Sequence, residues 1–83
     1  MISAYILTTV KQTGNLQKTI DNMKQIKNLK SISIVSGAYD LMILTNVPDL
    51  HGLFEVTNMI QCNPEVIKTS TQVIEREILE SLT

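Results

Sequence analysis

The order of hydrophobic patterns along this chain constrains its fold more than any other feature. Ile2–Val10 is rich in β-branched and aromatic residues, which predicts a strand. From Leu16 the apolar residues recur at helical spacing, with Asn15 or Thr13 placed to cap the helix. Leu29–Ser36 predicts a second strand, because Ile and Ser alternate within it. The first half therefore has the order strand, helix, strand.

The second half repeats that order. Gly37 predicts a turn, since glycine reaches positive φ without a Cβ clash, and Tyr39–Val47 predicts the next strand. Asp49 is placed to cap a second helix, Pro64 ends that helix, and Val66–Ile74 predicts the last strand. The complete order, β-α-β-β-α-β, is the ferredoxin-like α+β arrangement with a four-stranded antiparallel sheet.

The length of the chain limits the core that it can build. Its 83 residues contain no linker and predict a single domain, 1–83, with a short C-terminal tail at about 76–83. A domain of this size buries only about 60–65% of its unfolded surface. The core of one chain is therefore expected to be only marginally stable. Oligomerisation would bury further surface and compensate for this.

Charge and the start of the sequence argue against several classes of protein. The net charge is −1 and the seven Lys and Arg residues are scattered, which argues against autonomous nucleic-acid binding. The start lacks the features of a signal peptide, and no apolar run approaches the length of a membrane span. The single cysteine, Cys62, can form no internal disulfide, which predicts a cytoplasmic protein.

The third strand carries an uninterrupted apolar run, Leu41-Met42-Ile43-Leu44. A sheet covered on one face only should alternate apolar and polar residues. The run therefore indicates two covered faces, whereas two helices cover only one face of a four-stranded sheet. A second copy covering the other face predicts a sheet-to-sheet homodimer of the dimeric α+β barrel type. The alternative is a central strand that is simply apolar throughout.

A carboxylate lies between the predicted turn and this apolar run, at Asp40. Burying an unpaired carboxylate is costly. Asp40 is therefore expected at the rim of the sheet or against a group that meets it.

The sequence shows no pattern typical of catalysis, a metal site or a cofactor. His51 stands without a cysteine or a second histidine nearby and is interpreted as a surface residue. Cys62 has no histidine partner with a catalytic signature and is expected to be a small packing group. No glycine-rich phosphate loop is visible. We therefore expect a protein that is not an enzyme and holds neither metal nor cofactor.

Four short motifs, in order, resemble the effector-binding (RAM) domain of the leucine-responsive and asparagine-responsive (Lrp/AsnC) transcription regulators. They are Gly37-Ala38-Tyr39-Asp40, Val47-Pro48-Asp49-Leu50, Pro64-Glu65-Val66 and Thr69-Ser70-Thr71. Each motif alone is weak. In order and at the spacing of the family they are more specific, and together with the βαββαβ order the match covers nearly the whole chain.

The resemblance implies both assembly and ligand binding. Regulators of this family carry an N-terminal helix-turn-helix domain, whereas this sequence starts at the first strand of the effector domain. It therefore resembles a stand-alone module without direct DNA binding. Such modules form homodimers, the dimers assemble further, often into octamers that are tetramers of dimers, and amino acids bind between dimers. A full-length Lrp/AsnC regulator is a further candidate partner.

The resemblance also implies an effector site built from the turn and the fourth strand. Asp40 would accept from the ammonium group of an amino acid, and the backbone near Gly37 would donate to its carboxylate. Thr69 and Thr71 project from one side of the strand and Gln72 from the other, so either side supplies the remaining polar contacts. Each residue also has a structural alternative: turn glycine, strand packing, turn cap or edge-strand propensity. The full set is Gly37, Ala38, Tyr39, Asp40, Thr69, Thr71 and Gln72.

The sequence thus favours an amino-acid-sensing and oligomerisation module that modulates transcription or metabolism through protein partners. Two alternatives remain open. An ACT-type regulatory domain shares the βαββαβ order and amino-acid binding. A small dimeric α+β barrel enzyme shares the strand order.

Overall fold

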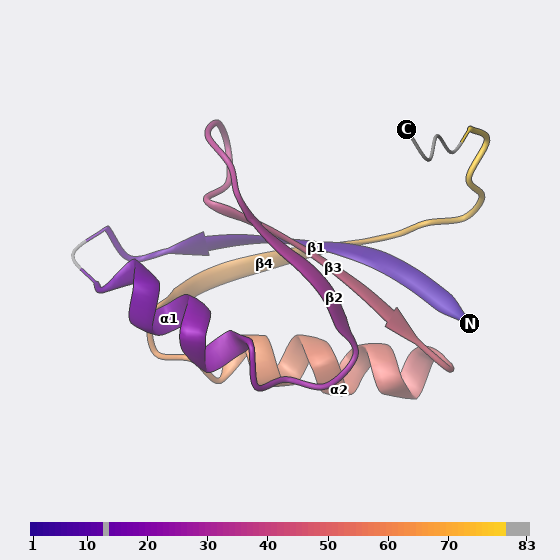
Figure 1. Ribbon diagram of the computed structural model, residues 1–83, viewed down its shortest axis with the longest axis horizontal. Helices are drawn as coiled ribbons and strands as arrows, with labels where there is room; N and C mark the ends of the chain where they lie inside the picture. The colour runs from indigo at the N-terminus through magenta and orange to yellow at the C-terminus, as the bar shows by residue number, and fades with distance from the viewer. Residues whose placement is uncertain (13, 80–83) are drawn as a thin grey trace.

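The six predicted elements are present in the predicted order (Figure 1). The computed structural model describes residues 1–12 and 14–79. Its elements are β1 (Ile2–Val10), α1 (Leu16–Met23), β2 (Leu29–Ile34), β3 (Leu41–Val47), α2 (Leu50–Gln61) and β4 (Val66–Val73). The fold is the ferredoxin-like α+β arrangement expected from the sequence.

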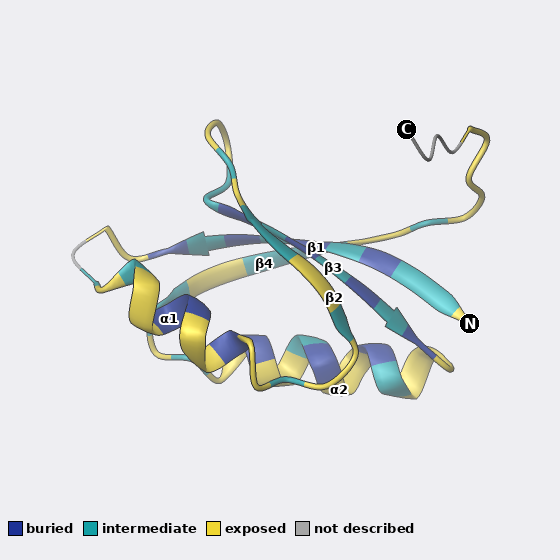
Figure 2. Cartoon of the chain, in the orientation of Figure 1, coloured by how far each residue is buried: buried dark blue, intermediate teal, exposed yellow. Residues whose placement is uncertain are grey.

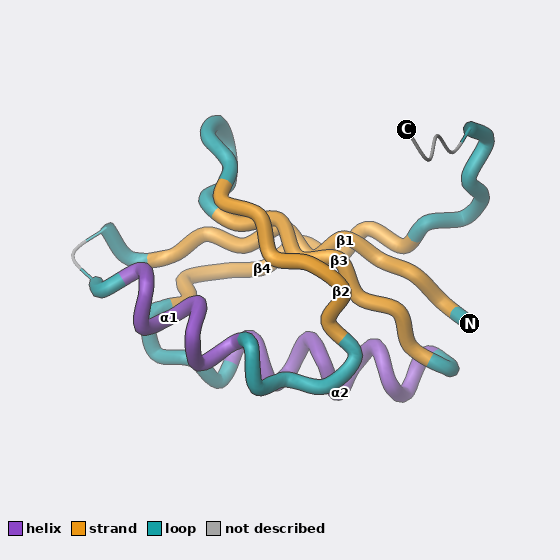
Figure 3. The backbone as a smooth tube through the Cα atoms, viewed as in Figure 1, coloured by secondary structure: helices purple, strands orange, loops and turns teal. Residues whose placement is uncertain are grey.

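The four strands form one antiparallel sheet in the order β2-β3-β1-β4 (Figure 3). Strands β1 and β3 are central, and β2 and β4 form the edges. Tyr5 of β1 lies opposite Leu44 of β3 on one side and opposite Gln72 of β4 on the other. Because side chains alternate along a strand, this register fixes which residues share a face.

Both helices cover the same face of the sheet (Figure 1). Buried residues alternate along β1 and β3, and those of the inner face pack against the helices (Figure 2). Helix α2 contributes Leu53, Val56 and Ile60 to this core, and α1 contributes Ile20 and Met23. Within the described residues, neither helix has the length and apolar character needed to cross a membrane.

Both helices begin at caps expected from the sequence. The Oδ1 atom of Asn15 accepts from the Lys18 N–H at 3.1 Å, and Oδ1 of Asp49 accepts from the Gly52 N–H at 2.9 Å. Each bond satisfies an amide group that the first turn of a helix leaves unpaired. Asn15 is therefore the cap of α1, and Thr13, the other candidate, lies outside the described residues.

The connection between β2 and β3 is longer than predicted. Strand β2 ends at Ile34 and β3 begins at Leu41, so each is two residues shorter at the turn than expected. The Val35 N–H donates to the Asp40 carbonyl at 2.9 Å and closes the connection. The apolar pattern continues beyond the last hydrogen bonds between the paired strands, so it predicts strands that are too long.

The second face of the sheet carries no helix in the part of the chain that the structure describes (Figure 1). At its centre, Tyr5 and Leu7 of β1 lie opposite Leu44 and Met42 of β3. We call these four residues the open-face cluster. They are only half-buried in the single chain. The apolar run of β3 thus supplies both faces of the sheet, and its covering by a second copy stays a prediction.

Candidate functional site

The predicted site begins at the turn between β2 and β3, which projects on the side of the sheet away from the helices (Figure 1). Gly37 has a φ of 132°, a region that L side chains rarely adopt. A Cβ built on Gly37 would meet no atom within 4 Å, so backbone conformation and not packing requires this glycine. Ala38 is exposed and Tyr39 is half-buried. The structure confirms a turn glycine at this position.

Asp40 joins this turn to the end of β1. Its N–H donates to the Thr8 carbonyl at 3.0 Å, and its Oδ2 accepts from the Val10 N–H at 2.9 Å. The pairing of β1 with β3 ends at Thr8 and Leu41, so the carboxylate takes the place of a further β3 residue opposite Val10. Asp40 therefore lies at the rim of the sheet, where its carboxylate pairs with the Val10 N–H at the end of β1.

The two carboxylate oxygens of Asp40 are held unequally. Oδ2 makes the short bond to the Val10 amide, whereas Oδ1 accepts from Gln12 Nε2 at 3.4 Å, near the limit for a hydrogen bond. The Gln12 contact is exposed. An ammonium group that replaced the Gln12 amide would form a shorter, charge-assisted bond to Oδ1. The turn-cap role and a ligand role are thus compatible at this side chain.

The predicted residues of β4 face in two directions. Thr69 lies opposite Thr8 and Thr71 opposite Ile6, which places both on the helix-covered face. The Thr69 hydroxyl already accepts from Gln61 Nε2 of α2 at 2.8 Å. Gln72 lies on the open face and donates from Nε2 to the Ser70 hydroxyl at 3.0 Å.

A single chain does not bring the turn and β4 together. Strand β1 lies between β3 and β4, so about 10 Å, or two strand spacings, separates the turn from β4. Asp40 borders a hollow of about 250 Å³ that is lined by residues of β1, α1, β2 and the loops beside them and by no residue of β4. The seven residues therefore do not lie together within the described chain.

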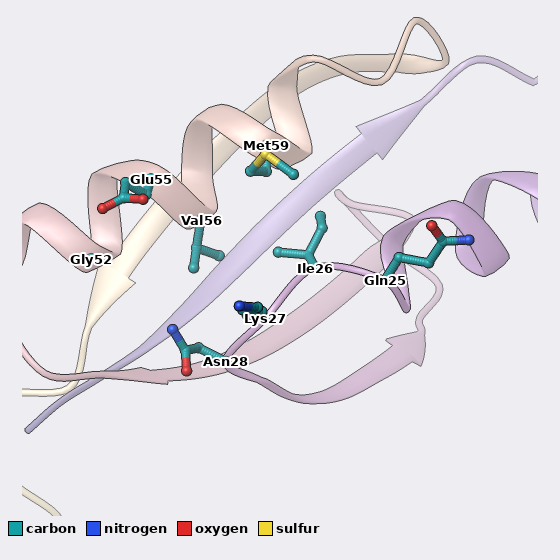
Figure 4. Close-up of a pocket in the computed structure, with 8 residues that line it drawn as sticks. All are labelled: Gln25, Ile26, Lys27, Asn28, Gly52, Glu55, Val56 and Met59. Carbon is teal, nitrogen blue, oxygen red and sulfur yellow. The ribbon is translucent and has the colours of Figure 1, made fainter.

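A hollow that sequence reasoning missed lies between α2 and the connection from α1 to β2 (Figure 4). It has a volume of about 320 Å³. Ile26, Val56 and Met59 supply apolar lining, and Lys27 and Glu55 supply opposite charges. These residues come from two separate segments without a shared motif, so no local signal in the sequence could have found the hollow.

The remaining reactive side chains lie at the surface of α2. His51 Nε2 is 3.0 Å from Glu55 Oε1, one helical turn away, and both side chains are exposed, as expected for a surface histidine. Cys62 is exposed at the C-cap of α2, so the expectation of a small packing group was wrong. Position 62 follows the last residue of α2, and its N–H donates to the Asn58 carbonyl at 2.9 Å.

A family model of the Lrp/AsnC ligand binding domain matches residues 3–83 of this chain. The chain belongs to this family. Membership decides against the ACT-type alternative, and it confirms the resemblance seen in the four motifs. Lrp/AsnC domains of this kind are regulatory and are not enzymes. Among curated proteins, none matches the chain.

Solved structures agree with the Lrp/AsnC assignment. TTHA0845 from Thermus thermophilus has a TM-score of 0.86 and 25% identity, over 96% of this chain and 100% of that one. FFRP-DM1 has a TM-score of 0.79 and 27% identity, over 89% and 99% of the two chains. A feast or famine regulatory protein from M. tuberculosis, complexed with L-methionine, has a TM-score of 0.84. At 17% identity, over 100% of this chain and 56% of that one, it shows the shared fold alone.

Proposed function

We propose that this Lrp/AsnC domain binds a free amino acid and converts that binding into a change of assembly or of affinity for a protein partner. Its family is a ligand-binding one, and a regulator of the same fold has been solved with L-methionine. A ligand shifts assembly only through its different affinity for the two states. A site shared between chains supplies that difference directly, because it exists only in the assembled state.

The proposed assembly is a homodimer formed through the open face, with octamers built from four such dimers. Tyr5, Leu7, Met42 and Leu44 form a central apolar patch that the described chain leaves without a covering helix. Covering it with a second copy removes that apolar surface from water and compensates for a small core. A full-length regulator of the family, with the same face, is a second candidate partner.

The proposed effector site lies between chains. The turn Gly37–Asp40 of one chain supplies Asp40 Oδ1 for the ammonium group and exposed backbone amides for the carboxylate. The segment Thr69–Gln72 of a neighbouring chain supplies hydroxyl and amide groups. The separation of turn and β4 within one chain supports this division, because the set is incomplete without a partner.

The domain acts in the cytoplasm, without catalysis and without binding DNA by itself. Within the described residues no group of three His, Cys, Asp or Glu side chains gathers as a metal site would require. The seven basic residues are offset by eight acidic ones. Regulation of transcription or metabolism is therefore proposed to pass through protein partners.

The observation that carries this proposal is the family match over residues 3–83. A thermal-shift screen with each of the twenty amino acids tests it, because a ligand of the folded state raises the melting temperature. We expect one or a few amino acids to raise Tm, with saturation at millimolar concentration. A flat response to all twenty would reject amino-acid binding.

A further inference from the structure

The last described residues form an extended segment, Glu75–Leu79, which we call the arm. Strand β4 ends at Val73, one residue before its predicted end, and the Ile74 N–H still donates to the Ser3 carbonyl at 2.8 Å. Beyond Ile74 the chain leaves the sheet and rises on the side away from the helices (Figure 1). The base of the arm is therefore held on β1, and the arm itself projects over the open side.

The arm presents two adjacent large apolar side chains to solvent. Ile78 is 85% exposed and Leu79 is 87% exposed. Isolated exposed apolar residues are ordinary in soluble proteins, but neighbouring ones on a projecting segment are typical of a contact surface. Burying both on a partner would remove nearly their whole apolar surface from water.

The arm's own chain offers these side chains an environment that is only partly apolar. A hollow of about 470 Å³ lies between the arm and the nearby end of the sheet. Its lining combines the polar residues Ser3, Lys30 and Asn46 with Tyr5 and Leu44 of the open-face cluster. An arm folded down on its own chain would therefore place Ile78 and Leu79 partly against groups that prefer water.

We propose that the arm packs on a second copy of this chain, where Ile78 and Leu79 bury their side chains. This inference rests on the sheet-to-sheet homodimer of the proposed function. In that dimer the partner's sheet would cover the open-face cluster, and the arm rises on this side of its own sheet (Figure 1). A two-fold interface makes the contact reciprocal, so each arm packs on the other chain and encloses the hollow beneath it.

Sedimentation over a concentration series tests the arm through the double variant Ile78→Asp/Leu79→Asp. We expect the dimer Kd to rise at least about tenfold, because two buried apolar side chains are replaced by exposed charges. The matched control is Leu50→Asp/Phe54→Asp, which places two charges at exposed apolar positions on α2, on the other side of the sheet. It should leave the dimer Kd unchanged, and an equal loss in the control would overturn the proposal.

A cross-linking experiment separates contact with a partner from contact within one chain. A photoreactive residue at position 78 is introduced into ¹⁴N and ¹⁵N protein, which are mixed and refolded together. We expect cross-linked peptides that join ¹⁴N to ¹⁵N chains. Products confined to single-isotope pairs would show that the arm packs on its own chain and would overturn the proposal.

The outcomes distinguish the arm from the dimer itself. A wild-type protein that sediments as a monomer at every concentration overturns the proposed homodimer and the arm contact together. A wild-type dimer whose Kd is the same in the arm variant overturns the arm contact alone.

Discussion

At the scale of single residues, the two carboxylate oxygens of Asp40 have different surroundings. One oxygen pairs with the Val10 amide and fixes the end of β1, while the other makes only a long, exposed contact with Gln12. A substitution that removes the whole carboxylate therefore changes stability and ligand binding together. A substitution that removes only the charge separates them.

Asp40→Asn is expected to weaken amino-acid binding at least tenfold with little effect on stability. The amide oxygen of Asn still accepts from the Val10 N–H, but the charge-assisted bond to an ammonium group is lost, at a cost of about 1.5–3 kcal/mol. Asp40→Ala should also lower the free energy of unfolding by about 1–2 kcal/mol, because the Val10 N–H loses its partner. Calorimetric titration measures the affinity, and urea unfolding measures the stability.

Asp21→Ala is the control for both variants. Asp21 is an exposed carboxylate on α1 that accepts from Gln17 Nε2 at 2.9 Å and lies 3.5 Å from Lys24 Nζ. Its removal deletes the same charge far from the turn and should leave affinity unchanged. Affinity that is equally unchanged in Asp40→Asn, with assembly intact, would reduce Asp40 to a turn cap.

At the scale of secondary structure, the sequence predicts the elements well because each has a local cause. Asn15 and Asp49 both cap helices, and the alternation along β1 places its inner residues in the core. The larger errors lie at the β2–β3 connection, where hydrogen bonds and not side-chain pattern define the strand ends. The Asp49 cap of α2 is one such local cause, and its contribution to stability can be measured.

Asp49→Ala should destabilise the fold by about 1 kcal/mol. The Asp49 carboxylate satisfies the Gly52 N–H at the start of α2, and alanine offers no acceptor. The midpoint of urea unfolding should fall without a change of slope. Asn58→Ala, at an exposed position within the same helix, should be neutral or slightly stabilising, since alanine has the higher helix propensity. An unchanged midpoint in Asp49→Ala would show that this cap does not stabilise the fold.

The candidate site was less predictable than the elements, for a physical reason. Gly37 and Asp40 follow from local turn chemistry, and both occupy the positions that the sequence indicated. The order of strands in the sheet decides instead how far the turn lies from Thr69, and β1 separates them. No motif encodes that distance.

The whole molecule is expected to be a dimer or a larger even oligomer at micromolar concentration. The open-face cluster is a central apolar surface in a chain of only 83 residues. Light scattering should give twice the 9.3 kDa chain mass or a larger even multiple. Leu44→Asp, at the centre of the cluster, should shift the mass to that of the monomer. A wild-type monomer at high concentration would contradict the sheet-to-sheet interface.

Duplex DNA should not bind to the purified protein at physiological salt. With a net charge of −1, few phosphates are neutralised, so the counterion-release term that drives such binding is small. A gel-shift titration with duplex DNA should show no shift at micromolar protein. A sub-micromolar, sequence-dependent shift would contradict this expectation.

Calorimetric titration of the wild-type protein with the amino acid that gives the largest thermal shift tests the central claim most directly. A free amino acid of about nine non-hydrogen atoms, at roughly 0.6 kcal/mol each, binds with about 5–6 kcal/mol. We therefore expect saturable binding with a Kd of about tens to hundreds of micromolar. Heats that match dilution alone for all twenty amino acids, with a folded and assembled protein in the cell, would contradict an effector-binding function.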